Sequence, residues 1–459
     1  MKTRTGLGRS QIKTLARIFP GDTMTLAPAE MLIYGTDAGR KFDMPWAVVR
    51  PENKEQVQEL MRMAHKDRIP VIPRARGTNV VSACVPDQGG IILSCLNMDK
   101  ILSLDADNFT ALVQPGVITR DLQQEARRFG LFYPPDPASM RVSTIGGNIA
   151  TNAGGMRAVK YGVTRNYVLG LEVVLPGGRL INTGSRVHKN VVGLDLTGLF
   201  TGSEGTLGII VSAWLKLLPE PEYSATVLAC FENETMALEG VRDIFKLGLL
   251  PCALEFLPAE VMTCLSAFGP VPWPENSQSA LIVRVDGTTA CVTNQVAQIK
   301  SVLKNTVFQD LAMQEDEERI WEIRRLINPA SFSLGPDKVS DDVVVPRGKI
   351  LSAVQNFQQT ARKHGLNILA FGHVGDGNIH VNYMHNASDD KSRQAVDRAR
   401  KEVLRTVLEL GGSISGEHGV GLSKKPFISW QLGPDQIEIM KDLKKVFDPA
   451  GILNPGKGI

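Results

Sequence analysis

Two short motifs framed by glycines combine imidazole and carboxylate side chains. The first is Phe371-Gly372-His373-Val374-Gly375-Asp376-Gly377-Asn378-Ile379-His380-Val381-Asn382, which predicts a strand ending at His373, a turn and a returning strand. Such a hairpin would bring His373 and His380 together, and strand alternation would place His380 and Asn382 on one face. The second motif, Gly416-Glu417-His418-Gly419, sets an acid beside an imidazole in a turn.

These residue types are suited to holding a metal and moving a proton. Two imidazoles and one carboxylate form a common three-ligand site that leaves positions open for substrate. A lone histidine more often belongs to a core or a surface, but this chain has just seven histidines and three of them fall in these two motifs. Asp376 is a rival ligand, although its place at the turn favours a capping role.

Three other segments stand out: 134–139 is rich in proline, and 144–155 and 201–210 are dense in glycine and small residues. Closely spaced glycines let the backbone come close to a large planar or phosphorylated ligand. A long dinucleotide is the natural candidate, and tight turns in a β-rich domain are the alternative.

Several other cofactor and partner classes lack a signal in the sequence. No complete G-x-G-x-x-G follows a strand, and the G-x-x-x-x-G-K match at Gly451–Lys457 has Gly458 where Ser or Thr is required. The six cysteines contain no C-x-x-C pair, so electrons taken from a substrate would need an acceptor outside this chain. A net charge of +3 argues against a nucleic-acid protein.

Hydrophobic periodicity predicts the elements that would position these residues. Strand, helix and strand are expected at 47–50, 53–65 and 69–73, followed by the turn-rich loop Arg74–Asn79, whose backbone could face an anion. Further predicted elements are strands at 111–113, 169–175, 206–218, 225–230, 279–285 and 368–373, and helices at 235–247, 293–303, 353–364 and 434–446. The alternation after residue 220 suggests helices covering one face of a sheet.

A chain of 459 residues is too long for one hydrophobic core. Pro219-Glu220-Pro221-Glu222 fits neither a strand nor a helix and reads as a linker. We therefore expect domains at 1–220 and 221–420, with a C-terminal segment, 421–459, that packs back on the first domain.

The N-terminus and the hydropathy pattern bear on location. No stretch approaches the roughly 20 apolar residues that a membrane helix needs. Basic residues alternate with apolar ones before the first acid, Asp22, which predicts a basic surface helix and leaves an amphipathic presequence as the alternative; the basic residues are Lys2, Arg4, Arg9, Lys13 and Arg17. The cytoplasm is the expected compartment, with membrane association through a partner left open.

The glycine-rich segments, in this order after the Arg74–Asn79 loop, resemble the FAD-binding domain of the vanillyl-alcohol oxidase and p-cresol methylhydroxylase superfamily. Within it, the chain is most similar to the group of D-lactate dehydrogenase, the glycolate oxidase flavoprotein subunit and D-2-hydroxyglutarate dehydrogenase. The resemblance implies an α+β fold: a two-subdomain FAD-binding domain, a substrate or cap domain with an antiparallel sheet, and a C-terminal tail returning to the FAD domain.

The same resemblance implies noncovalent FAD and a set of residues that hold it. The Arg74–Asn79 loop would take the pyrophosphate, and the glycine-rich segments would line the adenine-to-flavin channel. The implied cofactor residues are Arg74, Gly77, Thr78, Asn79, Pro137, Ser139, Gly146, Gly147, Asn148, Thr151, Asn152, Gly154, Gly155, Glu204, Gly205, Gly208, Ile209, Ile210 and Asn454.

Roles at the catalytic site also follow from the resemblance. His373, His380 and Glu417 match the ligands of a divalent metal (Zn, or Mn/Fe), and His418 matches the catalytic base. The metal would lower the pKa of the substrate hydroxyl, so that an imidazole can accept its proton while a hydride leaves for the flavin.

The remaining site residues would bind the substrate. Arg324 is expected to grip its carboxylate in preference to Arg325, and Lys338 and Asn382 complete the catalytic set. Asn328 stands where relatives that use 2-hydroxyglutarate carry threonine, which tilts the expectation towards a smaller substrate.

The expected function is FAD-dependent oxidation of a small D-2-hydroxy acid, with D-lactate or glycolate favoured. Electrons would pass to a separate acceptor, either an iron–sulfur subunit or an electron-transfer flavoprotein. Three alternatives stay open: a D-2-hydroxyglutarate dehydrogenase, a noncatalytic FAD subunit that relays electrons, and a nonredox lipid synthase of the same superfamily.

Overall fold

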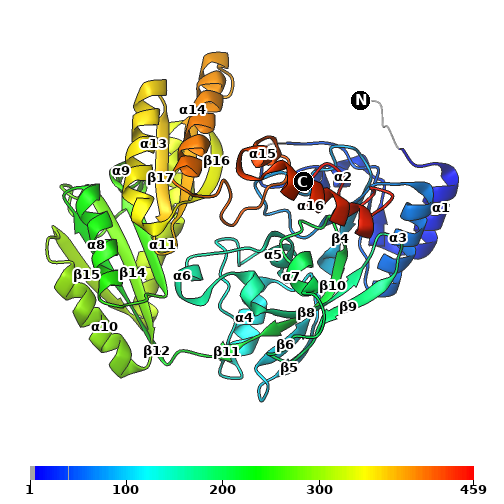
Figure 1. The fold of residues 1–459 in the computed structure, drawn as a ribbon, viewed down its shortest axis with the longest axis horizontal. Helices are drawn as coiled ribbons and strands as arrows, with labels where there is room; N and C mark the ends of the chain where they lie inside the picture. The colour runs from blue at the N-terminus through cyan, green and yellow to red at the C-terminus, as the bar shows by residue number, and fades with distance from the viewer. Residues whose placement is uncertain (1–5, 40, 459) are drawn as a thin grey trace. The chain divides into compact units, whose positions relative to one another are not determined.

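The computed structural model describes residues 6–39 and 41–458. The chain forms two compact units (Figure 1). The first comprises Met1–Gly154, Val163–Glu220 and Glu417–Ile459, and the second comprises Gly155–Gly162 and Pro221–Gly416. The sequence placed divisions after residues 220 and 420 and did not anticipate that 155–162 would join the second unit.

The first unit begins with a small sheet in the strand order β1-β2-β4-β3. Its strands are β1 (Met24–Thr25), β2 (Ala47–Val49), β3 (Val71–Arg74) and β4 (Ile91–Ser94), with β2 and β3 both parallel to β4. Helix α3 (Lys54–Asp67) connects β2 to β3 and begins at Asn53, whose side chain accepts a hydrogen bond from the Gln56 amide. The predicted strand–helix–strand unit is therefore confirmed.

A second, antiparallel sheet in the same unit has the order β5-β6-β10-β8-β9. Its strands are β5 (Ile101–Asp105), β6 (Thr110–Val113), β8 (Val168–Val174), β9 (Leu180–Gly184) and β10 (Ile209–Lys216). The short strands β7 (Leu131–Phe132) and β11 (Leu218–Pro219) pair with each other, so Pro219 ends a strand instead of opening the predicted linker. Proline is tolerated there because this two-stranded ribbon demands few amide donors.

Helices and chain ends complete the first unit. They are α1 (Arg9–Ile18), α2 (Pro28–Tyr34), α4 (Thr119–Arg127), α5 (Ile145–Thr151), α7 (Leu196–Phe200), α15 (Ile428–Gln431) and α16 (Pro434–Phe447). Helix α1 is the predicted basic surface helix: Leu15 and Ile18 are buried in a shared core while Lys13 and Arg17 are exposed. Lys2 and Arg4 lie outside the described residues.

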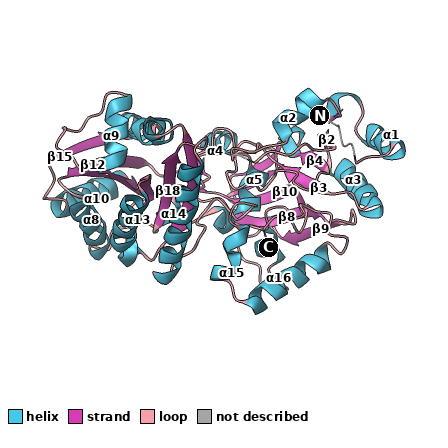
Figure 2. Ribbon diagram, turned by 90° about the horizontal axis from the view of Figure 1, so that it is seen from above, coloured by secondary structure: helices cyan, strands magenta, loops and turns pink. Residues whose placement is uncertain are grey.

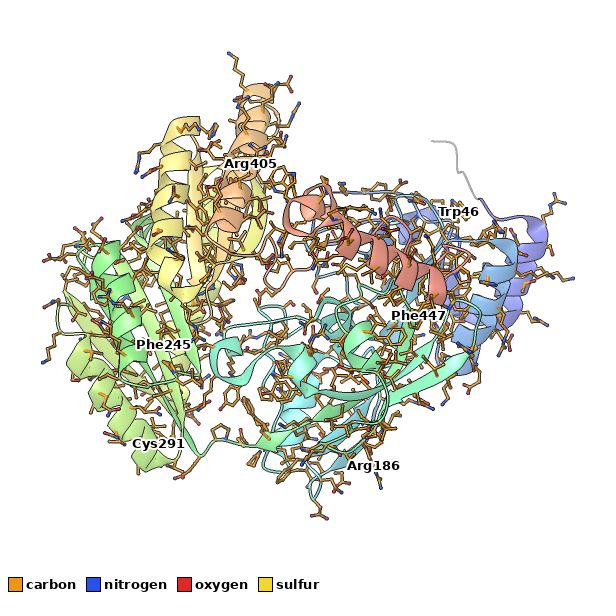
Figure 3. All side chains as sticks on the ribbon, viewed as in Figure 1. Trp46, Arg186, Phe245, Cys291, Arg405 and Phe447 are labelled. Carbon is orange, nitrogen blue, oxygen red and sulfur yellow. The ribbon has the colours of Figure 1, made fainter. Side chains whose placement is uncertain are left out.

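The C-terminal segment packs within the first unit. Leu453 bridges to Val71 of β3 in a parallel sense, and its side chain is fully buried in the core around α3. Phe447 of α16 packs edge to face on Phe200 of α7, with ring centroids 5.3 Å apart (Figure 3). These contacts join the last residues of the chain to the sheet that precedes the Arg74–Asn79 loop.

The second unit is built on a seven-stranded antiparallel sheet of order β15-β12-β14-β13-β17-β18-β16. Its strands are β12 (Tyr223–Phe231), β13 (Ala253–Pro258), β14 (Ser279–Gly287), β15 (Phe308–Met313), β16 (Asp337–Val344), β17 (Asn367–His373) and β18 (Asn378–His385). Its helices are α6 (Ala158–Tyr161), α8 (Glu234–Lys246), α9 (Ala259–Phe268), α10 (Thr289–Val302), α11 (Glu318–Arg325), α12 (Ile327–Ser331), α13 (Ile350–His364) and α14 (Asp390–Glu409).

Helices cover both faces of this sheet, whereas the sequence suggested one. Figure 2 shows α8, α10, α13 and α14 side by side along one face, with α9 on the other. Residues of α9, α11 and α12 share a core cluster with alternate residues of β12 and β14, such as Leu228 and Ile282. The short helices α11 and α12 escaped the prediction because neither is long enough to show a helical period.

Among the described residues, no helix is both long and apolar enough to cross a membrane. All six cysteines are free; five are buried and Cys291, on α10, is exposed (Figure 3).

Candidate active site

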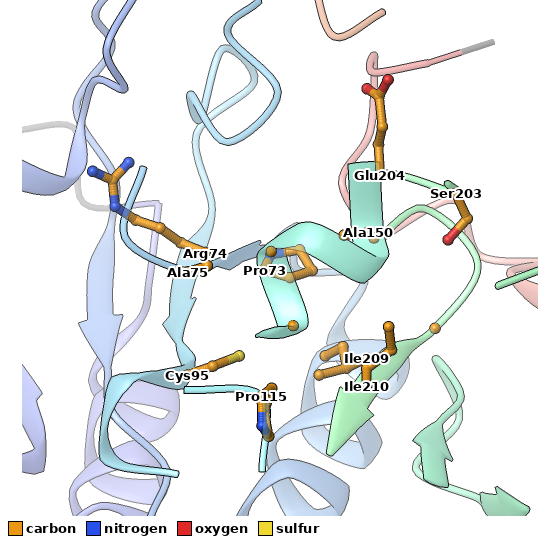
Figure 4. A pocket seen from close by; sticks show the side chains of 14 residues that line it. Pro73, Arg74, Ala75, Cys95, Pro115, Ala150, Ser203, Glu204, Ile209 and Ile210 are labelled. Carbon is orange, nitrogen blue, oxygen red and sulfur yellow. The ribbon is translucent and has the colours of Figure 1, made fainter. Parts of the chain in front are cut away.

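The glycine-rich segments of the first unit converge on one pocket (Figure 4). The empty space between its walls is about 500 Å³ when the part open to solvent is included. Its walls come from the end of β3, from α5, and from the segment that leads into β10. The lining residues are Pro73, Arg74, Ala75, Cys95, Pro115, Gly146, Gly147, Ala150, Ser203, Glu204, Gly205, Gly208, Ile209 and Ile210.

Two of these glycines are required by the local geometry. A Cβ on Gly146 would lie 2.5 Å from the Cβ of Pro115, so the two walls could not approach as closely with a side chain there. Gly205 has φ +65°, a conformation that favours glycine, and a Cβ there would lie 3.0 Å from Pro73. The glycines thus keep the walls close together and leave backbone at the pocket surface.

The pocket includes eight of the residues implied as cofactor ligands: Arg74, Gly146, Gly147, Glu204, Gly205, Gly208, Ile209 and Ile210. Cys95, Pro115 and Ser203 also line it and were missed, because a single Cys, Pro or Ser carries no spacing signal. The other implied residues do not line it: Gly77, Thr78, Asn79, Pro137, Ser139, Asn148, Thr151, Asn152, Gly154, Gly155 and Asn454.

The guanidinium of Arg74 is engaged with protein groups. It donates hydrogen bonds to the carbonyl of Thr36 at 2.5 Å and to the sulfur of Cys84 at 3.1 Å, and it lies over the ring of Tyr34. Figure 4 shows the side chain extending away from Pro115 and Ile209. The arginine therefore fastens β3 to the end of α2.

Other implied cofactor side chains tie the C-terminal segment to the pocket walls. Glu204, at φ +51°, accepts from the Val420 amide at 2.5 Å and the Gly421 amide at 2.8 Å. Its pKa is raised, because burial outweighs the opposing effect of these amides. Asn454 donates to the carbonyls of Ala83 and Glu204, which anchors the chain end. These side chains shape the pocket without facing its interior.

In the second unit, the predicted hairpin is confirmed. Strands β17 and β18 pair antiparallel, and the Nε2 atoms of His373 and His380 lie 3.2 Å apart. Asp376 accepts from the Asn378 amide in the turn, which is the expected capping contact. Asn382 follows His380 on β18 and accepts a hydrogen bond from Ser340 of β16.

A glutamate that the sequence reasoning missed links the histidines to the arginine. Glu255 lies opposite His373 in the β13–β17 pairing, and its side chain is fully buried. Its Oε1 lies 2.5 Å from Nδ1 of His373, and its Oε2 accepts from Nε of Arg324 at 2.6 Å. Burial by itself would raise the pKa of Glu255, but these two partners lower it to about 2, so the carboxylate stays ionised.

The two candidate arginines differ in their surroundings. Arg324 on α11 has a side chain only 12% exposed, and its guanidinium lies over the ring of Phe371. Arg325 pairs with Glu318 on the surface of the same helix. Lys338 of β16 donates to Asn328 and lies over Phe332. Arg324 is thus the arginine that shares a carboxylate with His373, and its expected contact with the substrate carboxylate stays a prediction.

Glu417 and His418 occupy the turn that follows Gly416. The amide of Gly416 donates to Asp342 at 2.8 Å, and the carbonyl of His418 accepts from Asn79 at 3.0 Å. Glu417 Oε1 lies 3.6 Å from Nε2 of His418, too far for a direct hydrogen bond. His373 and His380 belong to the second unit and Glu417 to the first, and each offers one possible ligand atom.

The two imidazoles fit a divalent metal. Two nitrogens that share a metal at about 2.0–2.1 Å, with angles between those of octahedral and tetrahedral sites, are about 2.8–3.4 Å apart. The 3.2 Å between the two Nε2 atoms falls in this range. His373 also has the carboxylate partner on its other nitrogen that metal-binding histidines usually have.

Comparison with solved structures supports the fold. p-Cresol methylhydroxylase with substrate bound matches at a TM-score of 0.81 and 18% identity, covering 98% of this chain and 97% of that one. Alkyldihydroxyacetonephosphate synthase matches at a TM-score of 0.75 and 20% identity, covering 98% and 86%. At these identities the likeness establishes the architecture alone.

Comparison of sequences establishes the family. Glycolate oxidase subunit GlcD of Bacillus subtilis (strain 168) is 41% identical, over 94% of this chain and 92% of that protein. D-lactate dehydrogenase of Anaerostipes hadrus is 35% identical, over 96% and 94%. D-2-hydroxyglutarate dehydrogenase of Stutzerimonas stutzeri (strain A1501) is also 35% identical, over 97% of each chain. Residues 45–184 match the FAD binding domain and residues 220–458 the C-terminal domain of FAD linked oxidases, so the chain belongs to the FAD-linked oxidases.

Proposed function

We propose that this protein oxidises a small D-2-hydroxy acid, D-lactate or glycolate in preference to larger acids, to the 2-oxo acid. The observation that carries this proposal is the His373–Glu255–Arg324 arrangement in the second unit. A guanidinium suited to a carboxylate and an imidazole suited to a metal are held by the same buried side chain. A 2-hydroxy acid presents the two groups, carboxylate and hydroxyl, that this pair would recognise.

The residues of this chain divide the work of the reaction. Bound FAD, held noncovalently in the first-unit pocket, supplies the hydride acceptor, and a divalent metal lowers the pKa of the substrate hydroxyl. His373, His380 and Glu417 would hold the metal. Arg324 would bind the carboxylate through its Nη groups, since Nε is already committed to Glu255.

Proton transfer falls to His418. A neutral imidazole can accept the hydroxyl proton, while the α-hydrogen leaves with its electron pair for the flavin. Lys338 and Asn382 would add polar contacts beside the substrate, and the bonds of these side chains to Asn328 and Ser340 fix their positions. The metal identity, Zn or Mn/Fe, does not alter this division.

Electrons would leave through a separate protein, an iron–sulfur subunit or an electron-transfer flavoprotein. The six free cysteines are spread over both units, which gives the chain no cluster motif of its own. The name of one relative, glycolate oxidase subunit GlcD of Bacillus subtilis, contains the word subunit. The proposed compartment is the cytoplasm. The alternative is that the partner protein holds this chain at a membrane.

The test is anaerobic reduction of the flavin by a panel of D- and L-2-hydroxy acids that includes lactate, glycolate and 2-hydroxyglutarate. Rapid bleaching by D-lactate or glycolate supports the proposal. Bleaching by D-2-hydroxyglutarate alone would assign the chain to the larger substrate named for one relative. Absence of bleaching by every acid would refute the proposed reaction.

A further inference from the structure

Glu255 is an unusual residue for its position. It lies in β13 between Leu254 and Phe256, where every side chain of the strand is buried, and its own exposure is 0%. A buried carboxylate is costly unless each oxygen is paired. The fold therefore retains an ionised group in an apolar sheet, which calls for a role at this place.

Both oxygens of Glu255 are assigned, each to a different functional side chain. A carboxylate ion only accepts hydrogen bonds, so the 2.5 Å contact to Nδ1 of His373 requires the proton on that nitrogen. Nε2 is then the ring nitrogen that faces His380, 3.2 Å from its Nε2, and it is the atom that would ligate a metal. The contact thus selects the tautomer that can act as a ligand.

The second oxygen orients Arg324. Oε2 accepts a hydrogen bond from Nε of Arg324 at 2.6 Å. The side of the guanidinium that carries Nε therefore faces β13. Stacking over Phe371 fixes the plane of the group. With Nε committed to Glu255, the Nη groups are the donors that a substrate carboxylate would use.

We propose that Glu255 is a positioning residue that holds His373 as the Nδ1–H tautomer and Arg324 with its fork facing the substrate, so that one carboxylate aligns the metal site and the carboxylate site. This role rests on the proposed function. Because one side chain positions both His373 and Arg324, a change at position 255 should affect metal binding and substrate binding together.

The test compares Glu255→Gln with Asp341→Asn in the FAD-loaded protein. Both partners of Glu255 donate, so an amide can satisfy only one of them and sets its NH₂ against the other donor. Asp341 is the matched control because it is buried at 1% and accepts from Nε and Nη2 of Arg400 at 2.8 Å. Each substitution removes one charge from a buried carboxylate–arginine pair.

We measure the affinity for Zn²⁺ by competition with a chromophoric chelator, and the apparent dissociation constant for the hydroxy acid in single-turnover flavin reduction. Glu255→Gln should lower Zn²⁺ affinity about 10- to 100-fold, the range typical of lost partners of metal-binding histidines. It should also weaken acid binding by about tenfold or more. Asp341→Asn should leave both constants within about twofold, because Asp341 pairs with Val381, which lies on the opposite face of β18 from His380 and Asn382.

A second measurement needs no variant. In the Zn²⁺-loaded parent protein, ¹⁵N shifts of the His373 ring should report a protonated Nδ1, and a protonated Nε2 would overturn the inference. Parent-like Zn²⁺ and acid affinities in Glu255→Gln would overturn it as well. Failure of the parent to bind any of Zn²⁺, Mn²⁺ and Fe²⁺ would instead refute the metal role in the proposed function, and with it the part of the positioning role that concerns His373.

Discussion

Replacing Gly154 by alanine should disturb Glu417, the proposed metal ligand, while leaving the fold intact. Both residues belong to the first unit, and a Cβ on Gly154 would lie 2.8 Å from Oε2 and 3.2 Å from Cβ of Glu417. Ordinary contact begins at 3.4 Å, so the carboxylate has to move by about 0.6 Å, whereas metal–ligand distances tolerate about ±0.2 Å. The carboxylate is the end of a flexible side chain, so the cost falls on ligand geometry and little on stability.

The expected result is a loss of about 10- to 100-fold in Zn²⁺ affinity, similar to the effect of disturbing a ligand's support. Gly177→Ala is the matched control, because a Cβ at Gly177 has no atom within 4 Å. The assay measures metal and FAD content side by side, together with the thermal midpoint. Parent-like Zn²⁺ affinity in Gly154→Ala would refute the assignment of Glu417, and loss of FAD with metal retained would show that Gly154 serves the cofactor instead.

The proposed chemistry makes three further predictions. Glu417→Gln should lower metal content and regain activity with excess metal, whereas His418→Ala should keep metal and FAD but reduce flavin about 10²- to 10⁴-fold more slowly; the opposite pattern would reverse the two roles. Acid or heat should release the FAD from the polypeptide, and flavin that stays on the denatured chain would contradict noncovalent binding. The isolated protein should not turn over efficiently with NAD, since electrons are expected to leave through a partner that co-purification or coupled reduction would reveal; rapid turnover with NAD alone would disprove this.

Much of the fold could be predicted because its signals are local. The apolar period of α3 is visible within a dozen residues, and its Asn53 cap precedes the first helical turn. The His373–His380 hairpin has the same property: two strands and a glycine turn lie within 12 consecutive residues, from Phe371 to Asn382. A one-face helical cover for the second sheet was the wrong expectation, because α11 and α12 are too short to display a period and are held by tertiary packing.

The role of Arg74 shows the limit of motif reasoning on a single side chain. The loop Arg74–Asn79 predicted an anion site, and the end of β3 does line the pocket. The guanidinium nevertheless bonds to Thr36 and Cys84, which stand 38 and 10 residues away. A basic residue beside a glycine turn has the same local sequence whether it faces a phosphate or a neighbouring carbonyl. Only the packing of α2 against the sheet decides between them.

Glu255 shows the same limit in the active site. Its burial could have been predicted from the sequence, but its partners could not. Glu255 is the single acid in the apolar run Cys252-Ala253-Leu254-Glu255-Phe256-Leu257. An acid in such a run is expected to be buried when the chain folds, and a buried carboxylate needs a partner. Its partners could not be read there, because His373 lies 118 residues away and Arg324 lies 69 residues away. The antiparallel register of β13 with β17 sets Glu255 opposite His373, and the packing of α11 over the same face brings Arg324 to the other oxygen. The types of the reacting side chains are thus visible in the sequence, whereas their alignment depends on a register that only the folded sheet defines.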